Sequence, residues 1–501
     1  MTQSFFNGLF SLFHLNILLG IAVGIILGLV VGLLPAIGPS MIIVLSLPFI
    51  FGVDPILALP MLTSMMAMNY TAGAATSIIM GIPGSTAAVA TVLDGFPMTK
   101  KGLGGRALGA AFAASALGGV GSVVFAILMM PVVHPIVLAF KSAEMFSLLL
   151  LAICFMATVS KGAMTKGLIS GCIGILLGFV GFHKTTGADR WTFGSIYVYD
   201  GISIVSVMLG LFALTILLDM RLSGKPLAKI DTAQAGDLRE LWEGVKEVFR
   251  HLGLWFRSTV IGYIVGVIPG IGAETAIWVA YGHAKMTSKD PSSFGTGNIE
   301  GVIAPESADN AKEGGALLTT MAFGVPGSVG MAYMLVAFMV VGLQPGPKLI
   351  AEHADVCFAL LHSLAIANIV GATVCFFAAP LLLKVTRVEP IYLFVTIMPL
   401  TLIGAYNEGA SLSDVVIMLM ITVLGIFMHK NRYPFATAVL GYVLAPFLEL
   451  YFWRALSLGG PLFFLTPISI VLILCTILML GNNFFISSFK RLLEPKGRKV
   501  A

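Results

Sequence analysis

Long stretches of the chain carry no formal charge, and short polar segments separate them. Residues 1–53 contain no Asp, Glu, Lys or Arg. The other long uncharged stretches are 55–93, 107–140, 145–160, 201–218, 314–347, 356–383, 391–407 and 455–489. An α-helix needs about 20 apolar residues to cross a bilayer, and some of these stretches are long enough for two crossings. The pattern therefore predicts an all-α polytopic membrane protein with roughly 10 to 12 transmembrane helices.

One uncharged stretch, residues 314–347, is interrupted by the sequence Gly-Val-Pro-Gly-Ser at 324–328. Proline removes a backbone donor and glycine lets the chain leave helical geometry, so a helix should break here. The apolar arms on either side are about 10 and 15 residues long, and each is short for a transmembrane span. We therefore expect a re-entrant helical hairpin near 313–347, with a proline-kinked spanning helix as the alternative. Unwound backbone at this depth is tolerated where it lines a polar cavity, which makes the break a candidate binding site.

The same motif occurs a second time, as Gly-Ile-Pro-Gly-Ser at 81–85, and predicts another re-entrant hairpin near 70–97. An earlier pair of similar segments, 31–38 (VGLLPAIG) and 265–272 (VGVIPGIG), precedes the two breaks. The prolines of the two motifs are 48 residues apart in the first copy and 57 in the second. Two motifs that recur in the same order indicate an internal duplication, and paired breaks at corresponding positions are typical of transporter repeats.

The duplication divides the chain into two repeat halves, residues 1–220 and 258–501, joined by a polar linker at 221–257. Within the linker, Leu238–Phe256 places apolar residues at helical spacing opposite charged ones, which predicts an amphipathic helix at the membrane surface. After the first break, we expect Asp94 to Pro97 to form a solvent-facing loop that closes the hairpin.

Composition and charge agree with a membrane protein. Hydrophobic residues make up 58% of the chain, charged residues make up 11%, and the mean hydropathy is +0.98. The net charge of +5 is small for 501 residues and lies in connecting segments, so no nucleic-acid partner is expected. The N-terminal residues have no basic n-region and no small-residue cleavage site after the first apolar run, so a cleaved signal peptide is not expected. The tail predicts a cytoplasmic C-terminus by the positive-inside rule, because it carries Lys490, Arg491, Lys496, Arg498 and Lys499.

The sequence shows no motif of an enzyme or of a resident cofactor. The five cysteines and eight histidines are dispersed and lack metal-ligand spacing. No nucleotide-binding P-loop and no nucleophile–base arrangement is present, so we expect neither catalysis nor primary pumping by this chain.

The broken helices supply two kinds of binding group. The N-terminus of a half-helix presents free N–H groups that suit an anion such as a carboxylate. Unwound carbonyls and helix C-termini suit a hard cation such as Na⁺. The candidate substrate-binding residues are Ser40, Asn69, Thr71, Pro83, Gly84, Ser85, Thr86, Asn310, Lys312, Pro326, Gly327 and Ser328. The candidate cation-binding residues are Pro35, Gly38, Thr76, Pro269, Gly270, Gly272, Glu274, Thr319 and Thr320.

Each candidate also has a structural interpretation. Serine and threonine hydroxyls can bond back to carbonyls of their own helix, and the prolines and glycines can shape the site without touching a ligand. Lys312 and Glu274 stand out because ionisable groups at membrane depth are usually functional. Alternatively, Lys312 lies in a wet loop before the hairpin and pairs with Glu306 or Asp309.

Four segments together resemble the large membrane subunit of the tripartite tricarboxylate transporters, the TctA family. They are GLLPAIG (32–38), GIPGSTAAVATVLDGFPMTKKGLGGRALG (81–109), GVIPGIG (266–272) and GVIAPESADNAKEGGALLTTMAFGVPGS (301–328). The family signature falls on Pro35, Gly38, Pro83, Gly84, Asp94, Gly95, Pro97, Pro269, Gly270, Gly272, Pro305, Glu306, Asn310, Gly314, Gly315, Pro326 and Gly327. The chain departs from it at Ala36, Asp309 and Thr319, which weakens any inference about the particular substrate.

The resemblance implies a multi-pass permease of the bacterial inner membrane. It would work with a small four-helix membrane subunit (TctB-like) and a periplasmic substrate-binding protein (TctC-like). The implied substrates are carboxylates such as citrate, or related dicarboxylates and aromatic acids, taken up with a cation, commonly Na⁺ with H⁺ as the alternative. An elevator-like mechanism with inverted repeats is implied by analogy with other tripartite carriers. An autonomous anion carrier, a scaffold or sensor without flux, and a membrane-embedded enzyme are the competing interpretations.

Overall fold

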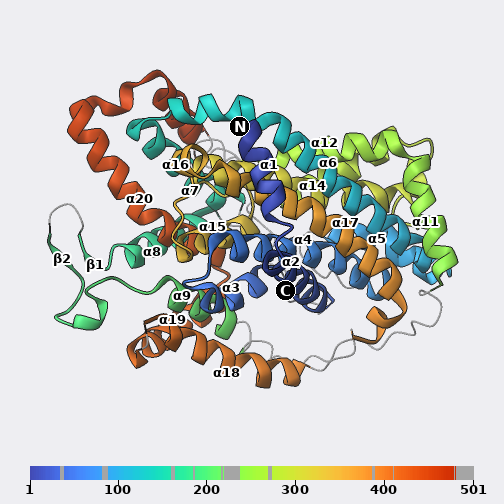
Figure 1. Ribbon diagram of the computed structural model, residues 1–501, viewed down its shortest axis with the longest axis horizontal. Helices are drawn as coiled ribbons and strands as arrows, with labels where there is room; N and C mark the ends of the chain where they lie inside the picture. The colour runs from blue at the N-terminus through green and yellow to red at the C-terminus, as the bar shows by residue number, and fades with distance from the viewer. Residues whose placement is uncertain are drawn as a thin grey trace, which may run out of the picture. The chain divides into compact units, whose positions relative to one another are not determined.

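The computed structural model describes residues 1–33, 39–81, 88–159, 164–183, 187–215, 237–268, 273–385, 390–409 and 411–478, with the single positions 218 and 480. The described chain is almost entirely helical, and its β-structure is one two-stranded hairpin (Figure 1). Five described helices are long and apolar enough to cross a membrane, and seven shorter apolar helices accompany them. The all-α polytopic membrane class predicted from the sequence is confirmed.

The chain forms two compact units, and each draws on both sequence halves. Unit 1 contains residues 1–138 and 203–426, and unit 2 contains residues 139–202 and 427–501. The first half contributes residues 139–202 to unit 2 and returns to unit 1 at 203, whereas the second half ends in unit 2. The halves at 1–220 and 258–501 remain a sequence prediction, and most of the linker, residues 219–236, lies outside the described residues.

Unit 1 holds most of the helices. Those from the first half are α1 (Thr2–Ser11), α2 (Leu15–Gly32), α3 (Pro39–Ile50), α4 (Pro55–Met80), α5 (Val89–Lys100), α6 (Gly104–Ala139), α9 (Ile204–Met208) and the π-helix Leu209–Leu214. The predicted linker contributes α11 (Leu238–Arg250), and α12 (Leu252–Val267) runs from the linker into the second half. The second half adds α13 (Ala273–Thr287), a 3₁₀ turn at Pro291–Ser293, α14 (Glu300–Phe323), α15 (Val329–Val340), α16 (Pro347–Glu352), α17 (Ala354–Val385), α18 (Pro390–Gly409) and α19 (Leu412–Lys430).

The two copies pack one helix pair in the same way. In the first copy, Gly24, Gly28 and Gly32 of α2 lie against backbone carbonyls of α4, at Met61, Met65 and Asn69. In the second copy, Gly262 and Gly266 of α12 lie against the carbonyls of Ala308 and Lys312 in α14. A side chain at any of these glycines would collide with the neighbouring backbone, so the close approach of the helices requires glycine.

Both central helices also end in the same way. Gly81 follows α4 and Gly324 follows α14, and each adopts the left-handed conformation, with φ of 66° and 65°. Glycine reaches this region without strain, which is why it terminates helices so often. The chain then enters the Pro-Gly-Ser segment of each break.

The second break folds back into unit 1. A Cβ atom placed on Gly327 would lie 2.7 Å from the Cα of Ala316 in α14 and would collide with the carbonyl of Gly266. The helix α15 then returns, and the N–H of Gly346 donates to the carbonyl of Met321 at 3.0 Å. The segment therefore leaves the end of α14, reaches back along it and returns to the same level, as a re-entrant segment does.

Two local expectations from the sequence are wrong. Residues 300–313 form the first half of a continuous buried helix, α14, and Lys312 is only 1% exposed, so it does not lie in a wet loop. Asp94 to Pro97 lie inside helix α5, and Asp94 is fully buried instead of facing solvent. Its carboxylate accepts backbone N–H bonds from Gly295, Gly297 and Asn298 and a bond from the Tyr281 hydroxyl, at 2.8 to 2.9 Å. Buried charge is tolerated because these donors satisfy it.

Unit 2 consists of α7 (Ser142–Val159), α8 (Met164–Gly178), strands β1 (Gly181–Phe182) and β2 (Asp189–Arg190), short 3₁₀ turns at Ile196–Val198 and Gly460–Leu465, α20 (Phe435–Gly459) and an apolar helix at Pro467–Leu478. Gly171 and Gly174 of α8 lie against the backbone of α20. The two strands pair antiparallel, and Arg190 forms a bidentate ion pair with Glu449 at 2.7 and 2.9 Å. This ion pair fastens the hairpin to α20.

Candidate functional site

The inner end of α15 lies among buried polar residues of unit 1. Ser328 caps this helix end, because its hydroxyl accepts the N–H of Met331 at 3.2 Å. A Cβ atom on Gly330, in the first turn, would lie 3.0 Å from the Tyr70 hydroxyl and 3.1 Å from the Met66 sulfur. The first turn of α15 is therefore pressed against the middle of α4, at residues without space for a side chain.

Lys312 lies beside the same tyrosine. Its ammonium nitrogen is 3.7 Å from the centre of the Tyr70 ring, a cation–π contact. The ammonium group also pairs with the carboxylates of Asp309 and Glu313, the latter at 3.1 Å. All three ionisable side chains are 1–2% exposed. A buried ammonium group with two carboxylates and an aromatic face has its charge compensated on several sides.

Asn310 of α14 forms hydrogen bonds to two other helices, α4 and α17. Its amide nitrogen donates to the Thr71 hydroxyl of α4 at 2.9 Å and to the Asn368 carboxamide oxygen of α17 at 2.6 Å. Its own carboxamide oxygen is buried and has no hydrogen-bond partner among the described residues, and the same holds for the amide nitrogen of Asn69. These atoms are available to a ligand or to water.

Glu306 is the third carboxyl group on this face of α14. Its two oxygens accept hydrogen bonds from Thr91 of α5 at 2.6 Å and from Ser115 of α6 at 3.0 Å. Thr91 is in the first turn of α5, the helix that follows the first break. The α14 face thus reaches the helices that follow both breaks: Glu306 contacts the start of α5, and Lys312 shares Tyr70 with the start of α15.

The buried face of α14 carries more acidic than basic groups. Glu306, Asp309 and Glu313 oppose the single cation of Lys312. If all four groups were ionised, the cluster would hold a net charge of about −2 in a region of low dielectric, which is unfavourable. Such a cluster stabilises a bound cation or proton, and the Lys312 ammonium with the free N–H groups of α15 can hold an anion.

The structure separates the candidate threonines by what they contact. The Thr319 hydroxyl lies 3.1 Å from the carbonyl of Gly315 in its own helix and 2.9 Å from the carbonyl of Val267, the last residue of α12, so it can also join α14 to α12. Thr76 and Thr320 instead bond carbonyls of their own helices, at Gly73 and Ala316. The structural interpretation holds for these two hydroxyls, and Thr319 is placed to take part in a site between helices.

The remaining candidates are divided by what the structure describes. Asn69, Thr71, Asn310, Lys312, Pro326, Gly327 and Ser328 all lie in or against the buried centre of unit 1. Ser40 and Glu274 lie at the starts of α3 and α13, and their side chains are outside the description. Pro35, Gly38, Pro83, Gly84, Ser85, Thr86, Pro269, Gly270 and Gly272 lie outside the described residues.

Sequence reasoning missed the aromatic and polar partners on neighbouring helices: Tyr70, Thr91, Ser115 and Asn368. Tyr70 and Thr91 lie within the hairpin predicted near 70–97, but each of the four residues takes its role from a contact far away along the chain. The spacing of Glu306, Asp309, Asn310 and Glu313, three or four residues apart, was a signal that could have placed one polar face on a helix.

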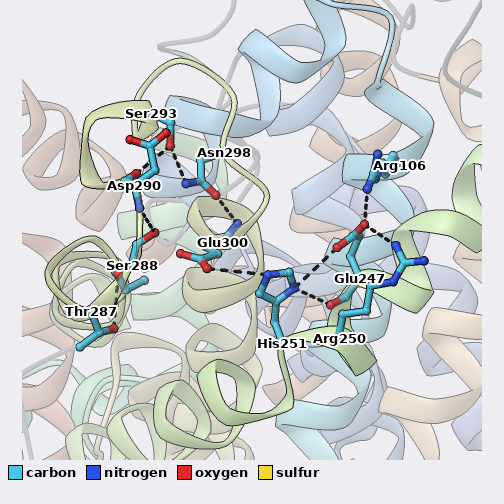
Figure 2. Close-up of polar contacts among 11 residues, drawn as sticks. Arg106, Glu247, Arg250, His251, Thr287, Ser288, Asp290, Ser293, Asn298 and Glu300 are labelled. Atoms are coloured by element: carbon cyan, nitrogen blue, oxygen red, sulfur yellow. Dashed lines mark hydrogen bonds and ion pairs between the residues drawn. The ribbon is translucent and has the colours of Figure 1, made fainter.

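A second polar cluster lies where α14 begins (Figure 2). Glu247 of α11 pairs with Arg106 of α6 and, at 2.8 Å, with Arg250. The ring of His251, at the corner between α11 and α12, lies 3.6 Å from Glu247 and 3.7 Å from Glu300 at the start of α14. We call Arg106, Glu247, Arg250, His251 and Glu300 the corner cluster. It holds the amphipathic helix α11 to the ends of α6 and α14, and α11 ends at Arg250, so the segment predicted as one helix turns at His251.

Comparison with known proteins agrees with this geometry. Residues 18–440 match the family described as "Tripartite tricarboxylate transporter TctA family". An Agrobacterium vitis protein described as "Uncharacterized 52.8 kDa protein in TAR-I ttuC' 3'region" is 31% identical over 436 residues, covering 86% of each chain. A second protein of that organism, "Uncharacterized protein in TAR-II ttuC' 3'region", is 32% identical over 226 residues, covering 44% of this chain and 93% of its own. No solved structure matches. Since the family match spans most of the chain and both re-entrant motifs, this protein belongs to the tripartite tricarboxylate transporter TctA family.

Proposed function

We propose that the chain is the large permease subunit of a tripartite, binding-protein-dependent secondary transporter that imports carboxylates. The substrates are citrate-like tricarboxylates or related dicarboxylates and aromatic acids. The observation that carries this proposal is the position of the α15 N-terminus, which lies in the interior of unit 1 beside Tyr70 and, through it, Lys312. Membership of the TctA family supports the substrate class.

The carboxylate would be held at the start of α15. Ser328 already satisfies the N–H of Met331, and the N–H groups of the first helical positions point toward the interior with the positive end of the helix dipole. The Lys312 ammonium group supplies the only described basic side chain of this cluster. The positive charge of Lys312 is compensated by Asp309 and Glu313, and a bound anion would interact with the same ammonium group.

The coupling ion would be Na⁺, with H⁺ as the alternative. The excess of carboxyl groups on α14 favours binding of a cation, and Na⁺ prefers oxygen ligands. Thr319 and the end of α12 offer a hydroxyl and backbone carbonyls next to the predicted Pro269–Gly272 segment. The chain itself holds no cofactor in this proposal.

Charge at the two ends of α14 supports an orientation in a bacterial inner membrane. The end where α14 begins gathers Lys100, Lys101, Arg106, Arg239, Lys246, Arg250, Lys285 and Lys289. The end next to Gly346 carries Lys348 with Glu352 and Asp355. By the positive-inside rule, this distribution supports a cytoplasmic position for the start of α14 and the corner cluster in the proposed orientation. A periplasmic binding protein would deliver substrate to the opposite side, and a small four-helix subunit would complete the membrane complex.

The direct test is uptake of labelled carboxylates into proteoliposomes that contain this chain and its small partner subunit. The binding protein is added or omitted, and each condition is run with and without a Na⁺ gradient. The proposal predicts uptake that needs both the binding protein and the gradient. Uptake without the binding protein would identify an autonomous carrier, dependence on a proton gradient alone would replace Na⁺ by H⁺, and no flux with any acid would favour a scaffold or sensor.

A further inference from the structure

One face of α12 carries four buried polar atoms that have no hydrogen-bond partner among the described residues. They are the indole nitrogen of Trp255, the hydroxyls of Ser258 and Thr259, and the phenol oxygen of Tyr263. Positions 255, 258, 259 and 263 share one side of a helix because they are spaced by three to four residues or a multiple. We call these four side chains the α12 polar row.

The lack of partners distinguishes the Ser258 and Thr259 hydroxyls from other buried serine and threonine hydroxyls described in unit 1. Other buried hydroxyls of unit 1 bond back to their own helices: Thr63 to Leu59 at 2.8 Å, Ser363 to Leu360 at 2.9 Å, and Thr422 to Met418 at 2.8 Å. A buried polar group that is left without a hydrogen bond destabilises the folded protein. Four of them in a row are tolerated when ordered water satisfies them, as it commonly does for buried polar groups.

The α12 polar row lies at the junction of α6, α12 and α14. Thr259 and Trp255 lie against Gly121 of α6, and the Tyr263 ring contacts Phe125 of the same helix with the ring centres 5.5 Å apart. On the α14 side, Gly262 and Gly266 of α12 meet Ala308 and Lys312. The inner end of the row is therefore level with Lys312 and its paired carboxylates of Asp309 and Glu313, which we call the Lys312 cluster.

The outer end of the row reaches the corner cluster. His251 precedes Trp255 by one helical turn and lies between Glu247 and Glu300 (Figure 2). From His251 to Tyr263 the helix rises about 18 Å, roughly half of a membrane. The row thus links a charged, partly exposed surface with the buried ionisable groups of α14.

The first repeat provides an internal comparison. Alignment of the motifs at 31–38 and 265–272 places the α12 polar row over Ile21, Gly24, Ile25 and Leu29 of α2. All four are apolar or glycine, although α2 packs on α4 through the same glycine pattern as α12 on α14. The shared helix packing therefore does not require hydroxyl groups at these positions, and the polar row belongs to the second repeat alone.

We propose that the α12 polar row lines a water-filled passage from the corner cluster to the Lys312 cluster. Through it, the buried carboxylates of α14 exchange a proton or a hydrated monovalent cation with one side of the membrane. The equivalent face of α2 is apolar, and the outer end of the row meets the corner cluster, so the passage opens to the side of α11. The role in ion exchange rests on the proposed transport function, whereas the passage itself does not.

Cysteine accessibility tests the passage without using transport. In a chain whose five native cysteines are replaced, Thr259→Cys is compared with Ile25→Cys, its equivalent in the first repeat. The probe is a membrane-impermeant, positively charged methanethiosulfonate, and Lys246→Cys on the exposed face of α11 reports which face it reaches. We expect the Thr259→Cys protein to react at least tenfold faster than the Ile25→Cys protein, from the same face as Lys246→Cys. Equal rates, or reaction only from the opposite face, would overturn the proposal.

Removal of the hydroxyl groups provides the second measurement. If the row were dry, Thr259→Val and Ser258→Ala would remove unsatisfied groups and raise the melting temperature. If the row is hydrated, we expect no such rise, together with uptake slowed severalfold at saturating substrate, while Thr422→Val and Ser363→Ala leave uptake unchanged. A raised melting temperature with unchanged uptake would refute the aqueous passage. Fast labelling of Thr259→Cys in a protein that transports no carboxylate would instead refute the proposed function and retain the passage.

Discussion

The Lys312 ammonium nitrogen lies 3.7 Å from the centre of the Tyr70 ring, and this contact joins the two repeats at the centre of unit 1. Tyr70 belongs to α4 of the first copy and Lys312 to α14 of the second. When the break motifs are aligned, Lys312 falls on Asn69 and Glu313 on Tyr70. The equivalent positions therefore hold neutral residues in the first copy, Asn69 and Tyr70, and charged residues in the second, Lys312 and Glu313. The two pairs contact each other through Lys312 and Tyr70.

Replacement of Lys312 by methionine should destabilise the protein and abolish uptake. The substitution retains most of the side-chain volume but leaves Asp309 and Glu313 without a cation, and breaking a buried pair costs about 3 to 5 kcal/mol. We expect a clear drop in the melting temperature measured in detergent. Removing the excess negative charge as well, in Lys312→Met with Asp309→Asn, should recover part of the stability but no uptake. If the double variant transports normally, Lys312 has no role in substrate binding.

Asp94 should stabilise the segment that leads into α14, although it is not a member of the Lys312 cluster. Its carboxylate accepts three backbone N–H groups from residues 295–298, which form the approach to α14. Asp94→Ala would remove the acceptor of these three partly buried backbone N–H groups, at about 1 kcal/mol for each hydrogen bond lost. We expect a lower melting temperature and increased proteolysis of the 288–299 segment.

Glu352→Ala is the matched control for Asp94→Ala. Glu352 is exposed and forms only a 3.9 Å contact with Lys348, so its loss should change stability by less than about 0.5 kcal/mol. Equal effects of the two substitutions would show that the Asp94 bonds do not hold this segment.

The corner cluster should make stability depend on pH in the acid range. Burial alone would raise the pKa of Glu247, but the hydrogen bonds and charges of Arg106 and Arg250 outweigh it, and the pKa is lowered from its ordinary value of 4.5. A carboxyl group whose pKa is lower in the folded state stabilises the fold above the unfolded pKa and loses this contribution as pH falls. We expect the melting temperature of the native protein to fall as the pH drops below about 4.5.

Glu247→Gln separates this effect from other carboxyl groups. The variant should melt lower than the native protein at pH 7, and the two melting curves should converge in acid because the native Glu247 is then protonated as well. A constant difference between the two proteins across the whole range would show that the pairing with Arg106 and Arg250 adds no stability.

The class of the protein and the places where its helices break could be predicted from the sequence. Uncharged stretches, the two Pro-Gly-Ser motifs and the glycines that end α4 and α14 are all local signals, and local signals fix where a helix can continue. The depth of Lys312 could not be predicted in this way. Five ionisable or amide residues between 306 and 313 resemble a solvated segment, and only contacts with Tyr70, Thr91, Ser115 and Asn368 allow them to be buried.

The helical conformation at Asp94 could not be predicted from the sequence either. A carboxylate followed by Gly, Phe and Pro resembles a turn, because these residues favour turns when nothing else acts on them. In the structure, the backbone N–H groups of a loop about 200 residues away satisfy the carboxylate, so the helix continues through it. At both Lys312 and Asp94, partners that are distant in the sequence allow an ionisable side chain to be buried in a helix.

Thr319 and Thr320 offer a test of the cation site within one turn of α14. The Thr319 hydroxyl reaches the carbonyl of Val267 in α12, whereas the Thr320 hydroxyl bonds only Ala316 of its own helix. If a coupling ion binds between α14 and the end of α12, Thr319→Ala should raise the Na⁺ concentration for half-maximal uptake about fivefold, equivalent to the roughly 1 kcal/mol of one hydrogen bond or ligand contact. Thr320→Ala should leave that concentration unchanged, since its hydroxyl faces its own helix. Equal shifts for both variants would indicate a general loss of helix packing, and no shift for Thr319→Ala would place the cation away from this junction.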